Sequence, residues 1–168
     1  LFPEDDFMTK KAIASSPELL YMRANILNKF EQDTKKIIIV HLNSFIKKLP
    51  APSSYKENRI NLKINNEINR EEFINKLVKI GYKRESMVYE TSDFAVRGFI
   101  IDIYPINEEN PIRIELFDDT IEKIKYFDAV TQKSIKEIEE ITISPIKDDF
   151  DNNNSSIREY NKDGIVLF

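Results

Sequence analysis

Three runs rich in Ile, Phe and Tyr dominate the pattern of hydrophobic and polar positions along this chain. They cover residues 99–105, 111–117 and 120–127, and short turn-forming segments at 107–111 and 118–119 separate them. Apolar and polar side chains alternate within the middle run, as they do on a β-strand with one buried face. Gaps this short suit hairpins, so we expect an antiparallel meander.

Two other segments have the three- and four-residue spacing of amphipathic helices. The first follows Ser16, which can cap a helix that begins at Pro17 and runs to about residue 31. Its expected core stripe consists of Leu19, Met22, Ile26 and Phe30. The second follows Asn69, which forms a capping-box-like pair with Glu72, and Gly81 suits its left-handed C-cap. The core stripe of this helix consists of Phe73, Leu77 and Ile80, widened by Ile74 and Val78.

Residues 36–42 contain a continuous apolar run bounded by lysines. Such a run is typical of a strand buried on both faces of a parallel sheet. We expect a short helix directly after it, capped by Asn43 or Ser44, which would complete half of a β–α–β unit. The segment 50–54, rich in Pro and Ser, breaks this pattern and is the best candidate for a domain boundary.

The remaining segments vary in how clearly they specify structure. Residues 59–65 alternate between apolar and polar, and 85–90 also suit a strand. Residues 134–143 fit a helix or a strand, and we favour a strand from Ile138 into Pro145. Residues 147–162 are acidic and rich in Asn and Ser, which indicates a loop or disorder, while the apolar 165–168 suit a returning strand.

These elements predict a mixed α/β (α+β) fold with two lobes. Residues 1–55 form a truncated parallel α/β lobe, and 56–146 form a mixed, largely antiparallel sheet domain with one main helix. Residues 147–168 are expected to be an acidic loop and the start of a returning segment. Because Leu1-Phe2-Pro3 reads as chain already inside a fold, we expect a fragment of a larger protein.

Composition excludes several classes of function. The net charge of −4 over 168 residues argues against a general nucleic-acid binder, which usually presents a basic face to phosphates. The chain has no cysteine, which rules out disulfides and thiolate chemistry and fits a cytoplasmic protein. No apolar run approaches the roughly 20 residues needed to cross a bilayer, so no membrane association is expected.

Candidate catalytic and cofactor residues are few. Lys133-Ser134 lacks the preceding glycines of a phosphate-binding loop, and His41, the single histidine, cannot build a zinc site without cysteines. Asp118-Asp119 and Asp148-Asp149 could bind a hard cation or serve as acid and base. Their positions in a turn and a polar loop favour solvated carboxylates. We therefore expect no catalytic residue, metal or cofactor in this chain.

Basic and aromatic residues near the bend at 97–98 are more informative. Arg84 and Arg97 flank the start of the predicted sheet, and Arg113 lies on the polar side of a neighbouring strand, with Phe94 and Tyr104 nearby. Arginine makes forked contacts to carboxylates and is enriched at protein interfaces. Spacing alone favours a solvated sheet face with local salt bridges over a partner-binding patch.

A resemblance to a known family changes that balance. The segments Asp93-Phe-Ala-Val-Arg-Gly98, Asp102-Ile-Tyr-Pro105 and Pro111-Ile-Arg-Ile-Glu-Leu-Phe117 resemble the module shared by the transcription-repair coupling factor family and the excision-repair protein UvrB. Upstream, Phe2-Pro-Glu-Asp-Asp-Phe7 and Ser16-Pro-Glu-Leu19 are similar to the coupling-factor version. The resemblance spans about residues 1–146.

The resemblance implies a role for each part of the chain. Members of the family are bacterial DNA translocases that displace stalled RNA polymerase and recruit UvrA for nucleotide excision repair. Residues 1–55 would belong to a degenerate UvrB-like domain that has lost ATP binding, and 56–146 to the UvrA-docking domain. The motor, with its contacts to DNA and RNA polymerase, would lie outside this chain.

The resemblance also implies a set of partner-binding residues. Arg84 and Arg97 match basic residues of the docking face, whereas Ala95 stands where UvrB has a further arginine. We extend the expected UvrA contacts to Phe94, Tyr104 and Arg113. Three alternatives stay open: a UvrB-like nucleic-acid-binding module, a carboxylate hydrolase, and a structural piece that masks the docking face.

Overall fold

The structure, a computed structural model, describes residues 1–3, 17–30, 37–147 and 155–161. The chain forms two compact units: residues 59–146, here the sheet unit, and residues 1–58 with 147–168, here the terminal unit. Compactness does not reveal which family domain each unit represents. The division into 1–55, 56–146 and 147–168 therefore stays a prediction.

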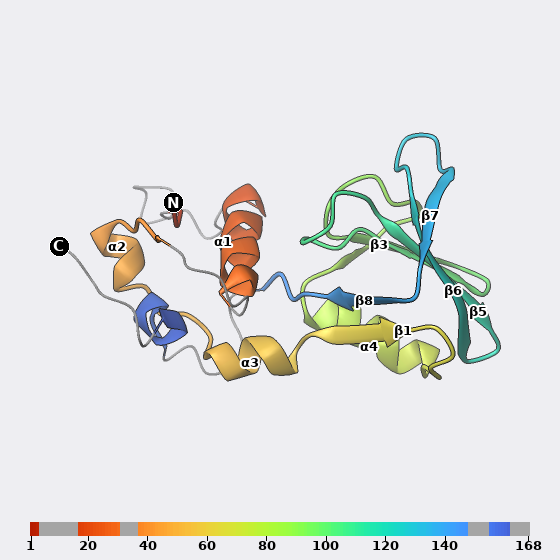
Figure 1. The fold of residues 1–168 in the computed structure, drawn as a ribbon, viewed down its shortest axis with the longest axis horizontal. Helices are drawn as coiled ribbons and strands as arrows, with labels where there is room; N and C mark the ends of the chain where they lie inside the picture. The colour runs from red at the N-terminus through yellow and green to blue at the C-terminus, as the bar shows by residue number, and fades with distance from the viewer. Residues whose placement is uncertain (4–16, 31–36, 148–154, 162–168) are drawn as a thin grey trace. The chain divides into compact units, whose positions relative to one another are not determined.

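A six-stranded sheet dominates the sheet unit, with strand order β2-β3-β4-β5-β6-β7 (Figure 1). The strands are β2 Lys83–Arg84, β3 Asp93–Arg97, β4 Ile100–Ile103, β5 Ile112–Phe117, β6 Thr120–Phe127 and β7 Ser134–Ile138. β2 and β3 are parallel, and every other neighbouring pair is antiparallel. The predicted meander and the predicted mixed, largely antiparallel sheet are confirmed.

Alternation of side chains gives this sheet an apolar face and a charged face, because residues directly opposite each other share a side. The fully buried members of the apolar face include Phe94, Ile101, Ile103, Ile112, Ile114 and Ile124. A row across the charged face consists of Ala95, Asp102, Arg113, Lys125 and Glu137. Burial of each large apolar side chain stabilises the fold by about 1.5–3 kcal/mol, so the apolar face anchors the strands.

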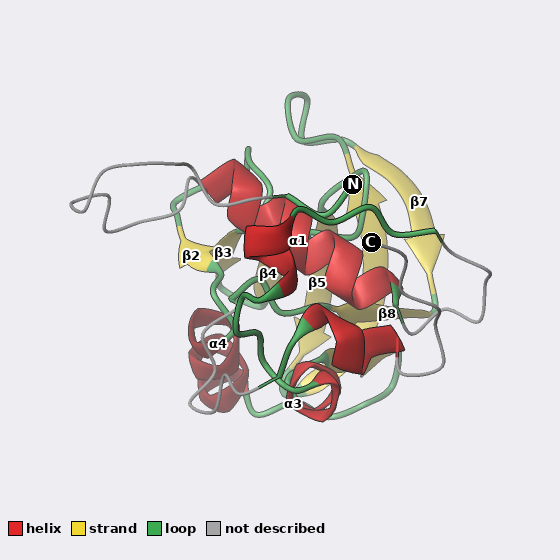
Figure 2. Ribbon diagram, turned by 90° about the vertical axis from the view of Figure 1, so that its left-hand side faces the viewer, coloured by secondary structure: helices red, strands yellow, loops and turns green. Residues whose placement is uncertain are grey.

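A small sheet and one helix complete the sheet unit, which Figure 2 colours by element type. The small sheet pairs β1 Ile60–Lys63 with β8 Glu140–Ile143, antiparallel. The helix is α4 Arg70–Lys79, and the side chain of Asn69 accepts a hydrogen bond from the Glu72 amide at 3.0 Å, as predicted for its cap. Phe73, Leu77 and Ile80 are buried, whereas Val78, expected in the core stripe, is 51% exposed.

The strand predicted at 85–90 is absent, and the edge strand β2 lies just before it. The carboxylate of Asp93 accepts hydrogen bonds from the amides of Tyr89 at 3.3 Å and Glu90 at 2.9 Å, and Ser92 has a φ of 82°. Side-chain bonds of this kind compete with a strand ladder for the backbone. The segment therefore forms no strand, and a turn at residues 91–92 follows it.

The strand predicted from Ile138 into Pro145 is divided between two sheets. β7 ends at Ile138, which pairs with Ile124 of the large sheet. β8 then begins at Glu140 and pairs with β1 in the small sheet. Residues 134–138 are thus strand as well, which resolves the helix-or-strand ambiguity of this segment.

The terminal unit contains α1 Pro17–Lys29, which begins where the sequence predicts. Its buried face differs from the predicted stripe. Arg23, Ala24 and Leu27 are almost fully buried, whereas Met22 is 52% exposed. Contacts with the rest of the fold determine which face of α1 is buried, and the spacing of apolar residues within the helix does not reveal those contacts. The predicted cap Ser16 lies outside the described residues.

The apolar run at 36–42 does not form the predicted strand over its described residues, 37–42. It holds a single parallel bridge between Phe2 and Val40, and Ile37 is 95% exposed. A strand buried on both faces needs neighbours on both sides, and this one bridge does not supply them. The expected short helix is present as α2 Leu42–Phe45 and begins before its predicted caps.

Helical turns also occur at two places where loops were predicted. α3 Pro52–Glu57 occupies much of the expected breaking segment, with Pro52 at its first position, where a missing amide hydrogen costs nothing. A 3₁₀ helix, η1 Ile157–Asn161, follows the antiparallel bridge between Leu49 and Ser155. The predicted loop at 148–154 and the returning strand at 165–168 lie outside the described residues.

No helix within the described ranges is long and apolar enough to cross a membrane. The described helices have between four and thirteen residues, well short of the roughly 20 that a span requires.

Tyr126 provides a pH test of this fold. Burial and a 2.7 Å hydrogen bond from its hydroxyl to the Glu108 carboxylate raise the pKa of Tyr126 to about 12. Because the unfolded pKa is about 10, this stabilisation is complete below pH 10 and is lost as the pH rises to 12. Tyr126→Phe should therefore lose stability less steeply than wild type across that window, as measured by urea unfolding from pH 9 to 12. Parallel curves for the two proteins would contradict this assignment.

Candidate functional site

The charged face of the large sheet is covered at one end and exposed at the other. At the covered end, Val88, Ala95 and Phe127 form a small buried cluster, against which Tyr104 packs. At the other end lie the turns of the β3–β4 and β5–β6 hairpins. Polar side chains on this face are therefore buried at the end near the cluster and exposed to solvent at the end near the two turns.

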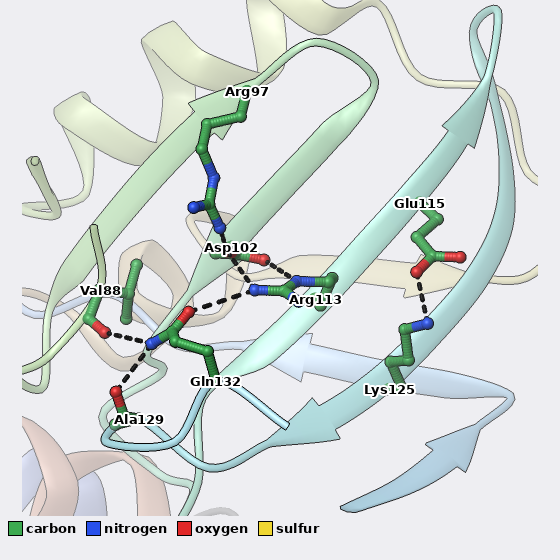
Figure 3. A network of polar contacts seen from close by, with 8 residues as sticks. All are labelled: Val88, Arg97, Asp102, Arg113, Glu115, Lys125, Ala129 and Gln132. Atoms are coloured by element: carbon green, nitrogen blue, oxygen red, sulfur yellow. Dashed lines mark hydrogen bonds and ion pairs between the residues drawn. The ribbon is translucent and has the colours of Figure 1, made fainter. Parts of the chain in front are cut away.

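The carboxylate of Asp102, only 1% exposed, lies at the centre of the network (Figure 3). Nη2 of Arg97 donates to its Oδ2 at 2.5 Å. Arg113 donates from Nε to Oδ1 at 2.7 Å and from Nη2 to Oδ2 at 2.9 Å. The register explains this meeting, because Asp102 is directly opposite Arg113 and Arg97 is two residues along β3 from its other neighbour.

Arg113 contacts Asp102, Gln132 and the ring of Phe127. Its side chain is 16% exposed, and its guanidinium carbon lies 4.6 Å from the ring centroid of Phe127. Nη2 also donates to Oε1 of Gln132 at 3.3 Å. The hydrogen bonds to Asp102, and the charge of that carboxylate, raise the pKa of Arg113 above its already high ordinary value, so it stays charged.

The loop after β6 fixes Gln132 in turn. Gln132 has a left-handed φ of 59°, and its Nε2 donates to the carbonyl oxygens of Ala129 at 2.7 Å and Val88 at 3.5 Å. The start of the loop is tied by Asp128, and the hydrogen bond from the Thr131 amide lowers the pKa of Asp128. The amide of Gln132 thus links two loops to Arg113 (Figure 3).

The network carries an excess of positive charge. Glu115, a further carboxylate of this face, forms an ion pair with Lys125. In the ion pairs of this network, three cations therefore share two carboxylates, namely Asp102 and Glu115. Arg97 has the most exposed cationic side chain of the three, at 43%, against 16% for Arg113 and 17% for Lys125. The uncompensated charge is consequently most accessible at Arg97.

The structure brings Arg97, Arg113 and Tyr104 to the charged face, as the sequence suggested. Tyr104 is partly buried, and its hydroxyl donates to the carbonyl oxygen of Glu109 at 2.8 Å. Phe94 requires a correction. Its side chain is 0% exposed and lies on the apolar face, so it packs in the core and is not available to a partner.

Arg84 lies elsewhere than expected. It is exposed at the edge of the sheet, but its register partner is Phe94, which belongs to the apolar side. The preceding residue, Lys83, is paired with Asp93 and therefore shares the side of Arg97. Sequence spacing alone could not separate these two neighbours, because the register of β2 was unknown.

Sequence reasoning also missed the importance of Asp102 and Gln132. Asp102 had a visible signal, since an acidic residue amid Ile100, Ile101 and Ile103 in a strand indicates a buried carboxylate that needs a partner. Gln132 had none, because its role depends on two loops that meet only in the fold.

The other sequence candidates do not assemble into a site. Asp118 lies in the β5–β6 turn with a φ of 51°, and His41 is an exposed residue before α2. Among the residues that the structure describes, no group of three His, Asp or Glu side chains is placed to hold a metal ion. Asp148-Asp149 lie outside those residues.

Comparison with known proteins gives the geometry a context. Residues 60–148 match the model of a family described as the UvrB interaction domain. Over 147 residues the chain is 40% identical to the transcription-repair-coupling factor of Staphylococcus haemolyticus and 41% identical to that of Staphylococcus aureus strain MRSA252. These matches cover 88% of the chain but only 12% of each relative.

The comparisons confirm the resemblance to transcription-repair coupling factors that the sequence motifs suggested. The matched family segment, residues 60–148, corresponds closely to the sheet unit at 59–146 and makes up more than half of the chain. The charged face, with Arg97 and Asp102, lies wholly within it. The chain belongs to the UvrB interaction domain family.

Proposed function

We propose that the sheet unit is a non-catalytic docking module that recruits UvrA, with the exposed end of the charged face as its binding surface. The observation that carries this proposal is Arg97, a charged and 43% exposed side chain attached to a buried carboxylate that it shares with Arg113. An arginine in a defined orientation is suited to bind carboxylates of a protein partner.

Two exposed aromatic side chains lie in the turns near this arginine. Phe99 is 57% exposed in the β3–β4 turn, and Phe117 is 72% exposed at the end of β5. The amide of Leu116 donates to the carbonyl oxygen of Phe99 at 2.8 Å, so the two turns lie side by side. Arginine and aromatic residues are the types that protein interfaces favour. The docking surface therefore comprises Arg97, Phe99 and Phe117, while Lys83 lies on the same side of the sheet but at the opposite end of β3.

The names of the relatives support a place for this module in transcription-coupled DNA repair. In the whole protein, RNA polymerase and DNA would be bound by parts beyond this chain, which spans 12% of those relatives. We place the protein in the bacterial cytoplasm, where transcription occurs. A nucleic-acid-binding role has less support, because Arg113 and Lys125 of the charged face are largely buried in ion pairs with carboxylates.

Arg97→Ala should weaken UvrA binding by about 2 kcal/mol, or roughly thirtyfold in Kd, as truncation of an interface anchor does. Titration calorimetry with purified UvrA measures the change. Lys63→Ala is the matched control, because it removes one exposed cation from the small sheet. Equal affinities of Arg97→Ala and wild type would refute the proposed surface.

Lys83 and Arg84 allow a test of the register argument, because they are adjacent, exposed and equally charged. Lys83→Ala should weaken binding by about 0.5–1 kcal/mol and reduce its salt dependence, as loss of a peripheral charge does. Arg84→Ala should have a smaller effect. Titrations at low and high salt check both. A larger loss for Arg84→Ala would favour the contact implied by the sequence resemblance.

A further inference from the structure

We propose that Asp102 is a positioning residue for docking: it fixes the orientation of Arg97 without neutralising it, so that Arg97 binds a carboxylate of the partner. This inference rests on the proposed function, since it concerns the same surface. It assigns a role to a buried residue that contacts no partner itself.

Asp102 cannot follow Arg97 if that side chain moves. Asp102 is 1% exposed, is flanked in its strand by the buried Ile101 and Ile103, and is held by two further bonds from Arg113. Association ordinarily costs the rotamer freedom of each side chain that becomes immobilised. A fixed acceptor at 2.5 Å from Nη2 of Arg97 removes much of that freedom before the partner arrives.

The same carboxylate leaves Arg97 charged and able to donate further hydrogen bonds. Arg113 forms two of the three hydrogen bonds to Asp102 that the guanidinium groups make. A guanidinium has five N–H donors, and the bond to Asp102 is the one that Arg97 makes within the described part of the chain. One carboxylate facing two arginines leaves a positive charge uncompensated.

The chemistry of the remaining donors identifies the group they bind. A guanidinium presents N–H groups in a planar fork that matches the two oxygens of a carboxylate. The exposed rings of Phe99 and Phe117 lie in the two adjacent turns next to the end of β3, where a bound partner would bury them beside such a pair. An Asp or Glu side chain on the surface of UvrA fits this arrangement.

A double-mutant cycle on the full 168-residue chain tests the proposal. Asp102→Asn keeps the size of the side chain but removes its charge and turns an amide toward a guanidinium. We expect Asp102→Asn to weaken UvrA binding about tenfold, and to have no further effect when Arg97 is already alanine, because interacting residues are non-additive. Glu140→Gln, which removes an exposed carboxylate from the small sheet, is the matched charge control and should leave affinity unchanged.

The cycle separates failure of this inference from failure of the docking surface. An equal loss from Asp102→Asn in both backgrounds, or an unchanged or tighter affinity, would overturn the positioning role while Arg97 kept its effect. If Arg97→Ala binds UvrA as tightly as wild type does, the proposed docking surface is wrong. The positioning role of Asp102 is then wrong as well.

A measurement on the unmodified protein covers the case in which Asp102→Asn fails to fold. NMR relaxation of the Nε–H groups reports how restricted each arginine side chain is. We expect a clearly higher order parameter for the Nε–H group of Arg97 than for that of the exposed Arg84. Equal values for the two side chains would overturn the proposal.

Discussion

The exposed surface of this domain depends on one buried carboxylate shared by two arginines. Asp102 has neighbours on both sides in the sheet, and the antiparallel register brings Arg97 from one strand and Arg113 from the other to its oxygens. A single carboxylate cannot compensate two guanidinium groups. The arginine that the fold leaves exposed therefore keeps its charge, while the buried one is fixed by Phe127 and Gln132.

Magnitudes indicate that this network serves geometry more than stability. Removal of a carboxylate from water costs several kcal/mol, and pairing in a buried site returns about that much. The apolar face contributes the net stabilisation, because each of its buried Ile or Phe side chains adds about 1.5–3 kcal/mol. The apolar face of the sheet thus stabilises the strands, and the charged face fixes the position of an exposed positive charge.

The sequence pattern predicted those elements that are determined by residues close together in the chain. The meander, the alternation of β1 and the Asn69 cap of α4 follow from periodicity and capping within a few residues. Predictions were wrong where the secondary structure depends on contacts with distant residues or on hydrogen bonds from side chains. Residues 85–90 form no strand because the Asp93 carboxylate binds the amides of Tyr89 and Glu90. Among the described residues, the run at 37–42 makes one isolated bridge in place of the strand pairing that its composition suits.

The same distinction applies to the candidate site. Residue type and resemblance pointed to Arg97 and Arg113, but the link between them through Asp102 required the register. The register also places Phe94 in the core and puts Lys83, not Arg84, on the side of Arg97. A shift of one residue reverses the side that a strand residue faces, so sequence spacing could not settle these positions.

Hydrogen exchange of the chain, free and in complex with UvrA, tests the central claim most directly. The account predicts that UvrA slows exchange in the turns of the β3–β4 and β5–β6 hairpins, around Gly98 and Asp118, and leaves β1 and β8 unchanged. Protection confined to the small sheet, with unchanged exchange at both turns, would contradict it.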